Sequence, residues 1–203
     1  MTEIQIGHLL RASTVGFVVG CRLSKFEAHA PSLGALVRTP GTNGYDTFGL
    51  IYDIHIDDDG LIRQLVTAER VDELTIADNR ENRTVPVEIS VLAVGYQLNG
   101  KIMHLLPPRP PLSLEVIYLC SQEELASFTS AGRFGYFRHI LRAKDMPVGE
   151  MLAAHLQQAQ DAQVAAGNPE WYTAATQEVI TLLRDDYPTL IGVLGTLADI
   201  ADF

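Results

Sequence analysis

Residues 85–124 constrain the fold most, because strand, turn and proline signals follow one another there in an order that few folds need. Residues 85–95 are apolar and rich in β-branched side chains, which indicates a buried β-strand. The Asn99-Gly100 pair predicts a hairpin turn. Prolines crowd residues 107–111, and proline disrupts both helices and ladder strands. This stretch therefore belongs to a small β structure.

The change from strand to helix is predicted at about residue 122. Residues 112–119 resume the strand pattern, and Ser121 is followed three residues later by Glu124. This spacing is typical of a capping box, in which the two side chains satisfy free backbone N–H groups at the start of a helix. We therefore expect an α+β chain, with a β-rich part over residues 1–122 and a helical appendage or small bundle of about four helices over residues 123–203.

Further strands are predicted from short apolar runs that turn residues separate. These runs cover residues 14–21, 33–38, 47–56 and 61–66. Residues 57–60, Asp-Asp-Asp-Gly, are predicted to form the hairpin turn between the last two runs. The polar residues 67–84 predict a short helix or a mobile excursion. Short strands with such turns are typical of an antiparallel barrel or sandwich.

The last two helices are predicted from apolar stripes and their start signals. Asn168-Pro169 provides an N-cap and a first helical residue for a helix whose apolar stripe is Trp171, Ala175, Val179 and Leu182. Pro188 is predicted to start the final helix. Its inward residues would be Ile191, Leu194 and Leu197.

Composition limits the class of protein. The 203 residues hold 15 basic and 25 acidic side chains, a net charge of −10. Direct nucleic-acid binding is not expected, because phosphate neutralisation needs a basic surface. No apolar run approaches the roughly 18 to 20 residues that span a bilayer, and residues 1–6 lack the basic start of a secretory signal. We expect a cytoplasmic protein in which Cys21 and Cys120 are reduced thiols.

The order of strands and turns resembles that of the HAS-barrel family. The resemblance rests on Gly16-Phe-Val-Val-Gly20, Leu33-Gly-Ala-Leu-Val-Arg38, Phe48-Gly-Leu-Ile-Tyr52, the apolar run at 87–95 and the proline crossing at 107–111. It covers roughly residues 8–120 and implies a small closed antiparallel β-barrel over residues 1–122. The HAS-barrel is the small N-terminal β-barrel of HerA-type DNA translocases and of ATP synthase subunits, in which a RecA-like ATPase follows the barrel.

This resemblance implies a role in assembly. Only about 80 residues follow the barrel here, which is too few for a RecA-like domain. The resemblance therefore implies a docking module that self-associates, as a homo-oligomer, or binds a separately encoded ATPase or nuclease. It implies no ATP hydrolysis.

No complete catalytic, cofactor-binding or metal-binding motif is present. Residues 95–102 nearly match a phosphate-binding loop, but Ile102 stands where the magnesium-binding hydroxyl belongs. The six histidines have no short metal-ligand spacing. We therefore expect no enzyme and no cofactor.

Two alternative functions stay open: weak single-strand nucleic-acid binding, and an enzyme with a site at the barrel–helix junction. Its dispersed residues would be Asp53, His55, His104 and Arg109.

One segment is predicted to contact a partner. Aromatic and basic side chains alternate over residues 128–144, with no acid between Leu125 and Lys144. Such a surface suits an acidic partner or, as a second interpretation, a single nucleic-acid strand. The predicted interaction residues are Arg133, Phe134, Tyr136, Phe137, Arg138, Arg142 and Lys144. The alternative is an amphipathic helix that buries its aromatic residues while its arginines pair with the chain's own acidic helices.

Overall fold

A six-stranded antiparallel barrel forms the first part of the computed structural model, which describes residues 3–22, 31–41, 44–58, 60–68, 71–82 and 85–201. The strands are β1 (Ile4–Ala12), β2 (Gly16–Cys21), β3 (Leu36–Pro40), β4 (Tyr45–Ile56), β5 (Val87–Leu98), β6 (Lys101–Met103) and β7 (Val116–Leu119). The ring runs β1-β7-β3-β4-β5-β2 and closes because β2 pairs with both β1 and β5. β6 extends β5 as a hairpin. The predicted closed barrel is confirmed.

Alternate side chains of the strands fill the barrel. Phe17, Val19 and Cys21 on β2 are buried, and each alternates with a less buried neighbour. This is the period of two expected for a strand with one face toward a core. The interior cluster consists of Ile6, Leu9, Phe17, Val19, Cys21, Ala35, Val37, Ile51, Val87, Ile89, Val91 and Ile117.

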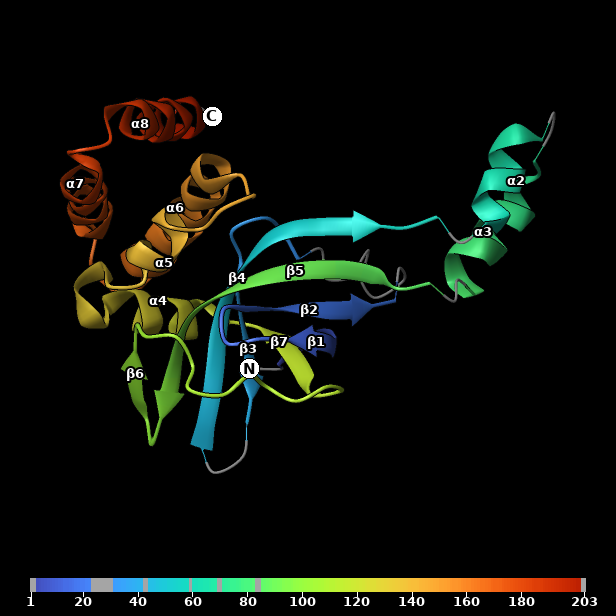
Figure 1. Cartoon of the computed structure of the whole chain (residues 1–203), viewed down its shortest axis with the longest axis horizontal. Helices are drawn as coiled ribbons and strands as arrows, with labels where there is room; N and C mark the ends of the chain where they lie inside the picture. Colours follow the sequence, from blue (N-terminus) through green and yellow to red (C-terminus); the bar gives the residue numbers. More distant parts are fainter. Residues whose placement is uncertain are drawn as a thin grey trace.

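A layer of helices covers one side of the barrel (Figure 1). It comprises α4 (Gln122–Ser130), the 3-10 helix η2 (Gly132–Phe134), α5 (Phe137–Leu141), α6 (Val148–Ala165), α7 (Trp171–Leu183) and α8 (Tyr187–Ala201). Phe48 and Leu50 of β4, with Leu92 and Val94 of β5, belong to the buried cluster that these helices complete. Both strands are therefore buried on two faces here, which explains why residues 47–51 are buried without alternation.

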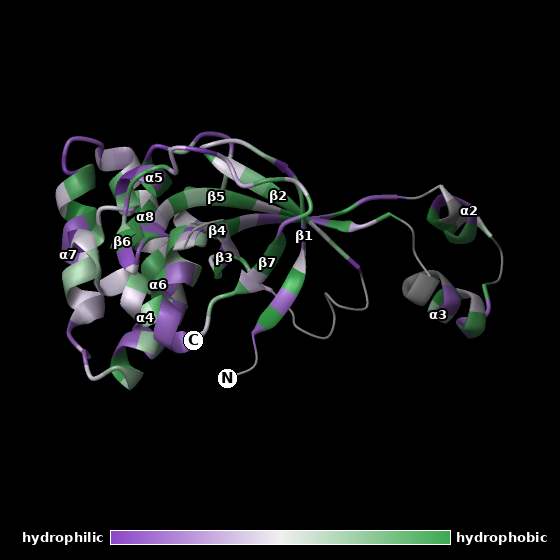
Figure 2. Cartoon of the chain, turned by 90° about the horizontal axis from the view of Figure 1, so that it is seen from below, coloured by the Kyte–Doolittle hydropathy of each residue, from purple (hydrophilic) through white to green (hydrophobic). Residues whose placement is uncertain are grey.

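Two more helices form an arm, residues 57–86, between β4 and β5. These helices are α2 (Leu61–Thr67) and α3 (Glu73–Asn82). The arm projects from the end of the barrel that lies away from α4–α8 (Figures 1 and 2). Neither helix contributes to either buried cluster of the described residues.

The strand predicted over residues 61–66 is wrong, because these residues lie in α2. Asp58 accepts a hydrogen bond from the Gly60 N–H (2.8 Å) and pairs with Arg63 (2.6 Å). These local contacts favour a turn into a helix over a hairpin. Asp59 of the predicted turn lies outside the described residues, as do positions 69–70 and 83–84 of the predicted excursion.

The predicted count of about four helices is also too low. The described residues contain seven α-helices, two in the arm and five after the barrel. The predicted helix start at Ser121 is that of α4, which ends at Ser130 and is separate from α5, and the mixed charges of the arm gave no clear period. The first barrel strand, β1, was not predicted either, although its pairing with β2 and β7 is needed to close the ring.

The final helices differ from prediction by a turn or less. α7 begins at Trp171 rather than Pro169, with Glu170 at the N-cap. Leu183 is buried on its apolar face, whereas the predicted Leu182 is exposed. On α8 the predicted Leu197 is buried, but Ile191 is exposed.

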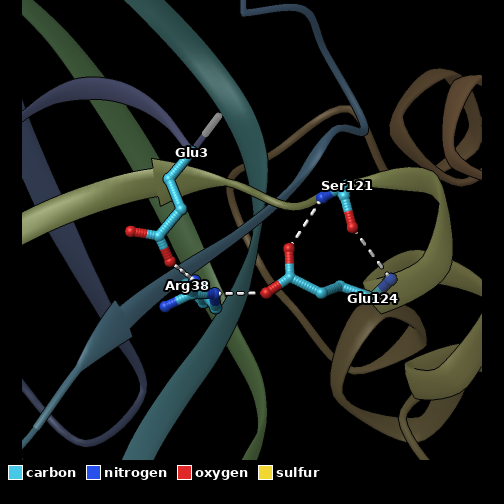
Figure 3. Close-up of polar contacts among 4 residues, drawn as sticks. All are labelled: Glu3, Arg38, Ser121 and Glu124. Carbon is cyan, nitrogen blue, oxygen red and sulfur yellow. Dashed lines mark hydrogen bonds and ion pairs between the residues drawn. The ribbon is translucent and has the colours of Figure 1, made fainter. Parts of the chain in front are cut away.

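The predicted capping box begins α4 and also ties it to the barrel (Figure 3). The Ser121 Oγ accepts a hydrogen bond from the Glu124 N–H (3.2 Å), and the Glu124 Oε2 accepts one from the Ser121 N–H (2.8 Å). The Glu124 Oε1 accepts a further hydrogen bond from the Nε of Arg38 on β3 (2.6 Å). Arg38 also pairs with Glu3. One carboxylate therefore orients the first helix of the layer on the barrel.

The loop before β3 packs closely against the backbone of α6. Gly34 has a φ of +76°, and a Cβ atom there would lie 2.5 Å from the backbone nitrogen of His155. Only glycine fits such a conformation and contact without displacement of the helix.

We expect Gly34→Ala to lower the free energy of unfolding by ~3 kcal/mol or more, because the added methyl group meets the backbone of α6 and the left-handed φ is strained. The matched change is Gly192→Ala in α8, where a Cβ would meet nothing within 4 Å. It should raise stability by up to ~1 kcal/mol through helix propensity. Chemical denaturation measures both. Equal effects of the two substitutions would contradict this packing.

We expect Glu124→Gln to lower the free energy of unfolding by ~1 to 2 kcal/mol, because glutamine keeps the cap but leaves the half-buried Arg38 without its strongest partner. Glu123→Gln removes the same charge from the same helix turn. This control substitution should lower the free energy of unfolding by less than ~0.5 kcal/mol. Denaturation of the two variants under identical conditions separates the ion pair from the helix dipole.

Candidate functional site

The aromatic residues of the predicted interaction segment lie in the core. Tyr136 and Phe137 are fully buried. Phe134 is partly buried and stacks on Phe137, with ring centroids 5.4 Å apart, and lies 5.7 Å from the ring of Trp171. These three side chains therefore anchor the segment and offer little surface to a partner. The interaction role of the segment stays a prediction, and its cations are the groups that could fulfil it.

The backbone turns sharply where the segment begins. Gly132, Arg133 and Phe134 have φ values of 57°, 47° and 58°. The left-handed conformation costs about 1 kcal/mol or more at each non-glycine residue. Packing of Phe134 offsets that cost, and the turn leaves Arg133 exposed.

The other three predicted cations meet at one cleft, which we call the basic cleft. Arg138, Arg142 and Lys144 line it together with Arg11, and its volume is about 780 Å³. One wall is the start of β2, and the other is α5 with the loop that leads to α6. Arg133 does not line it. The structure thus brings together three of the four cations that the sequence indicated and adds Arg11, which lies more than a hundred residues away along the chain.

Three of these four cations are not neutralised by the described carboxylates. Arg11 pairs with Glu88 (2.9 Å), whereas no ion pair within the described ranges involves Arg138, Arg142 or Lys144. Arg138 donates a hydrogen bond to the backbone carbonyl of His104. The alternative in which these arginines pair with the chain's acidic helices is therefore not what the described part of the chain shows.

His139 adds a polar group to the cleft. Its Nε2 lies 3.2 Å from the His104 carbonyl and donates to it. Burial lowers the pKa of His139, and the nearby charges of Arg138 and Arg142 lower it further. The imidazole is therefore neutral at pH 7.

A second histidine is structural. The Tyr136 hydroxyl donates a hydrogen bond to His155 Nε2 (3.1 Å), and His155 Nδ1 donates one to the Gly34 carbonyl (3.0 Å). Both side chains are fully buried. Burial lowers the pKa of His155 to about 4. Because no solvent reaches the pair, its role is to join α5, α6 and the loop before β3.

The structure does not assemble the dispersed site of the enzyme alternative. Asp53 and His55 lie exposed on β4, toward the arm, and His55 pairs with Asp57 (3.1 Å). His104 is buried against α4 and donates to the Phe128 carbonyl (3.0 Å). Arg109 lines a separate cavity of about 490 Å³ beside Tyr45 and Tyr96, which none of the other three enters.

The arm carries the second unusual surface. Val66 on α2 is 77% exposed and Leu74 on α3 is 81% exposed. Ile56 and Ile76 are also exposed. Residues 57–86 hold eight acidic and four basic side chains. Sequence reasoning missed this surface because the segment was expected in part to be a strand.

Comparisons with protein families and with curated proteins found no match to this chain. The resemblance to the HAS-barrel therefore rests on the quoted motifs alone. Among the residues that the structure describes, no group of three or more His, Cys, Asp or Glu side chains could hold a metal ion. No helix in the same residues is long and apolar enough to cross a membrane.

The buried histidine predicts a pH dependence of stability. The pKa of His155 is about 4 in the folded state, against an ordinary value of 6.5. Between these values the unfolded chain binds more protons, so stability is full above pH 6.5 and falls as the pH drops toward 4. The size of the pKa shift of His155 corresponds to a loss of ~3 kcal/mol in the free energy of unfolding.

We expect His155→Gln to be less stable at pH 7 but to lose less stability between pH 6.5 and pH 4 than the parent chain. Denaturant unfolding at several pH values measures the difference. Parallel profiles for the parent and the His155→Gln variant would contradict the assignment.

Proposed function

We propose that this chain is a non-enzymatic docking module that presents its arm to a protein partner. The observation that carries the proposal is the exposure of Val66 and Leu74 on helices that project from the barrel (Figure 2). In that figure the arm stands apart from both layers of the fold. Exposed apolar groups on a projecting element are typical of an interaction site.

The composition of the arm indicates the chemistry of its partner. Its exposed apolar side chains need an apolar groove in which to be buried. Its surplus of four acidic side chains favours a groove with basic residues at its rim, since complementary charge steers association. The partner is therefore a protein with an apolar, basic-rimmed groove.

The resemblance to the HAS-barrel adds a class of partner. Barrels of that family pack side by side in rings or dock other proteins, so a separately encoded HerA-type ATPase or a nuclease is the first candidate. Closure of the barrel supports docking through the arm rather than through a free sheet edge, because closure leaves few unpaired strands.

We expect Val66→Ser with Leu74→Ser to weaken the complex with the candidate ATPase or nuclease by about tenfold or more, because buried apolar anchors carry most of the binding energy at interfaces. Both side chains are exposed in the free chain, so folding should be unaffected. Calorimetric titration of purified proteins measures the change.

The control variant is Val164→Ser, which changes an exposed apolar residue on α6. It should leave the affinity unchanged. Light scattering of the chain alone tests the homo-oligomer, because self-association that the arm variant abolishes would make the partner a second copy. A strict monomer that binds neither candidate, or a complex indifferent to the arm variant, would refute docking through the arm.

A further inference from the structure

The basic cleft has the size and the lining of a small-molecule site. Its volume of about 780 Å³ falls within the range of about 300 to 1,000 Å³ that is usual for ligand pockets. Its walls are largely apolar, with side chains from the start of β2, from β5 and from the segments around α5. The apolar residues that line it include Val15, Leu92, Leu106 and Met146.

The charge of the cleft is uncompensated. Arg138, Arg142 and Lys144 supply three positive charges, and no carboxylate of the described residues lines the cleft. The fourth cation, Arg11, is balanced by Glu88. Cations crowded at one place repel one another, and a bound anion removes that repulsion.

Part of the cleft is preorganised for an anion. The guanidinium of Arg138 is held by the His104 carbonyl, which fixes the direction of its remaining N–H groups. His139 is tethered to the same carbonyl (3.2 Å). Arg142 and Lys144 are exposed and form no described hydrogen bond, so their side chains are available to close on a ligand.

We infer that the basic cleft binds a small organic phosphate, with the phosphate group among Arg138, Arg142 and Lys144 and the apolar body of the ligand against Val15, Leu92 and Leu106. A phosphate monoester carries close to two negative charges at pH 7 and accepts bidentate hydrogen bonds from arginine. It matches three cations better than a carboxylate does. The apolar walls favour an ester over inorganic phosphate.

This site is independent of the docking role of the arm. The cleft involves Gly16, at the start of β2, whereas Cys21, at the end of β2, pairs with Val87 beside the arm. The two surfaces therefore lie at opposite ends of β2, and either can exist without the other.

The probe for the test is phenyl phosphate, which joins a phosphate group to an apolar ring. We expect saturable binding to the whole chain by calorimetric titration at low salt, and amide NMR shifts that concentrate at residues 15–18. Benzoate has the same ring with one negative charge, and inorganic phosphate has the charge without the ring. Both should bind at least about tenfold more weakly.

Two cleft variants and one control variant distinguish binding at the cleft from attraction by the net charge of the chain. Arg142→Gln should weaken phenyl phosphate binding about tenfold, and the double change with Lys144→Gln should weaken it further. Arg133→Gln removes the same charge from the same segment but lies outside the cleft, and it should leave the affinity unchanged. All three changed positions are exposed, so a folding defect is not expected.

Three results would overturn the inference. The first is the absence of saturable binding by the parent chain. The second is an equal loss in Arg133→Gln and Arg142→Gln, which would show diffuse attraction by net charge. The third is benzoate binding as tight as that of phenyl phosphate, which would show that the site does not distinguish a phosphate.

Discussion

The need to cover the apolar outer face of β4 and β5 governs this structure. Phe48, Leu50, Leu92 and Val94 turn outward from a barrel whose interior is already full. Leaving them in water would forfeit about 25 cal/mol for each Å² of apolar surface. The helices α4, α5 and α6 bury this face, with Phe128 meeting Phe48 at a ring-centroid distance of 5.0 Å, and α7 and α8 pack on α6. The helical layer therefore forms a second core on the outer face of the barrel.

Polar contacts fix the orientation of the helical layer on the barrel, because apolar burial alone is non-directional. Glu124 joins the start of α4 to Arg38 on β3 (2.6 Å). His155 joins α6 to the Gly34 carbonyl (3.0 Å). Between these two points the chain turns sharply at residues 132–134, and α5 then packs on β5, across the basic cleft from the start of β2. The basic cleft is a consequence of this placement.

The same two strands connect the two proposed surfaces. β4 and β5 are each 12 residues long, and one end lies under the helices while the other carries the arm (Figure 1). The arm, with its proposed docking role, and the basic cleft, with its proposed anion site, therefore lie toward opposite ends of the paired strands β4 and β5. This separation would let the chain hold a partner and a ligand at once.

The sequence by itself determined most of the barrel's strands, the helix start at Ser121 and the cationic character of residues 133–144, because strand alternation, capping and composition are local properties. Closure of the barrel depends on the pairing of β2 with both β1 and β5, which is a tertiary property. The sequence did not determine α2, since the apolar residues of 61–66 fit both the strand period of two and the helix period of about 3.6. Nor could it place Arg11 beside Arg142, or show that Tyr136 and Phe137 are buried while Arg142 is exposed. Only the tertiary structure decided these points, because contacts between distant segments depend on which face of each element the shared core buries.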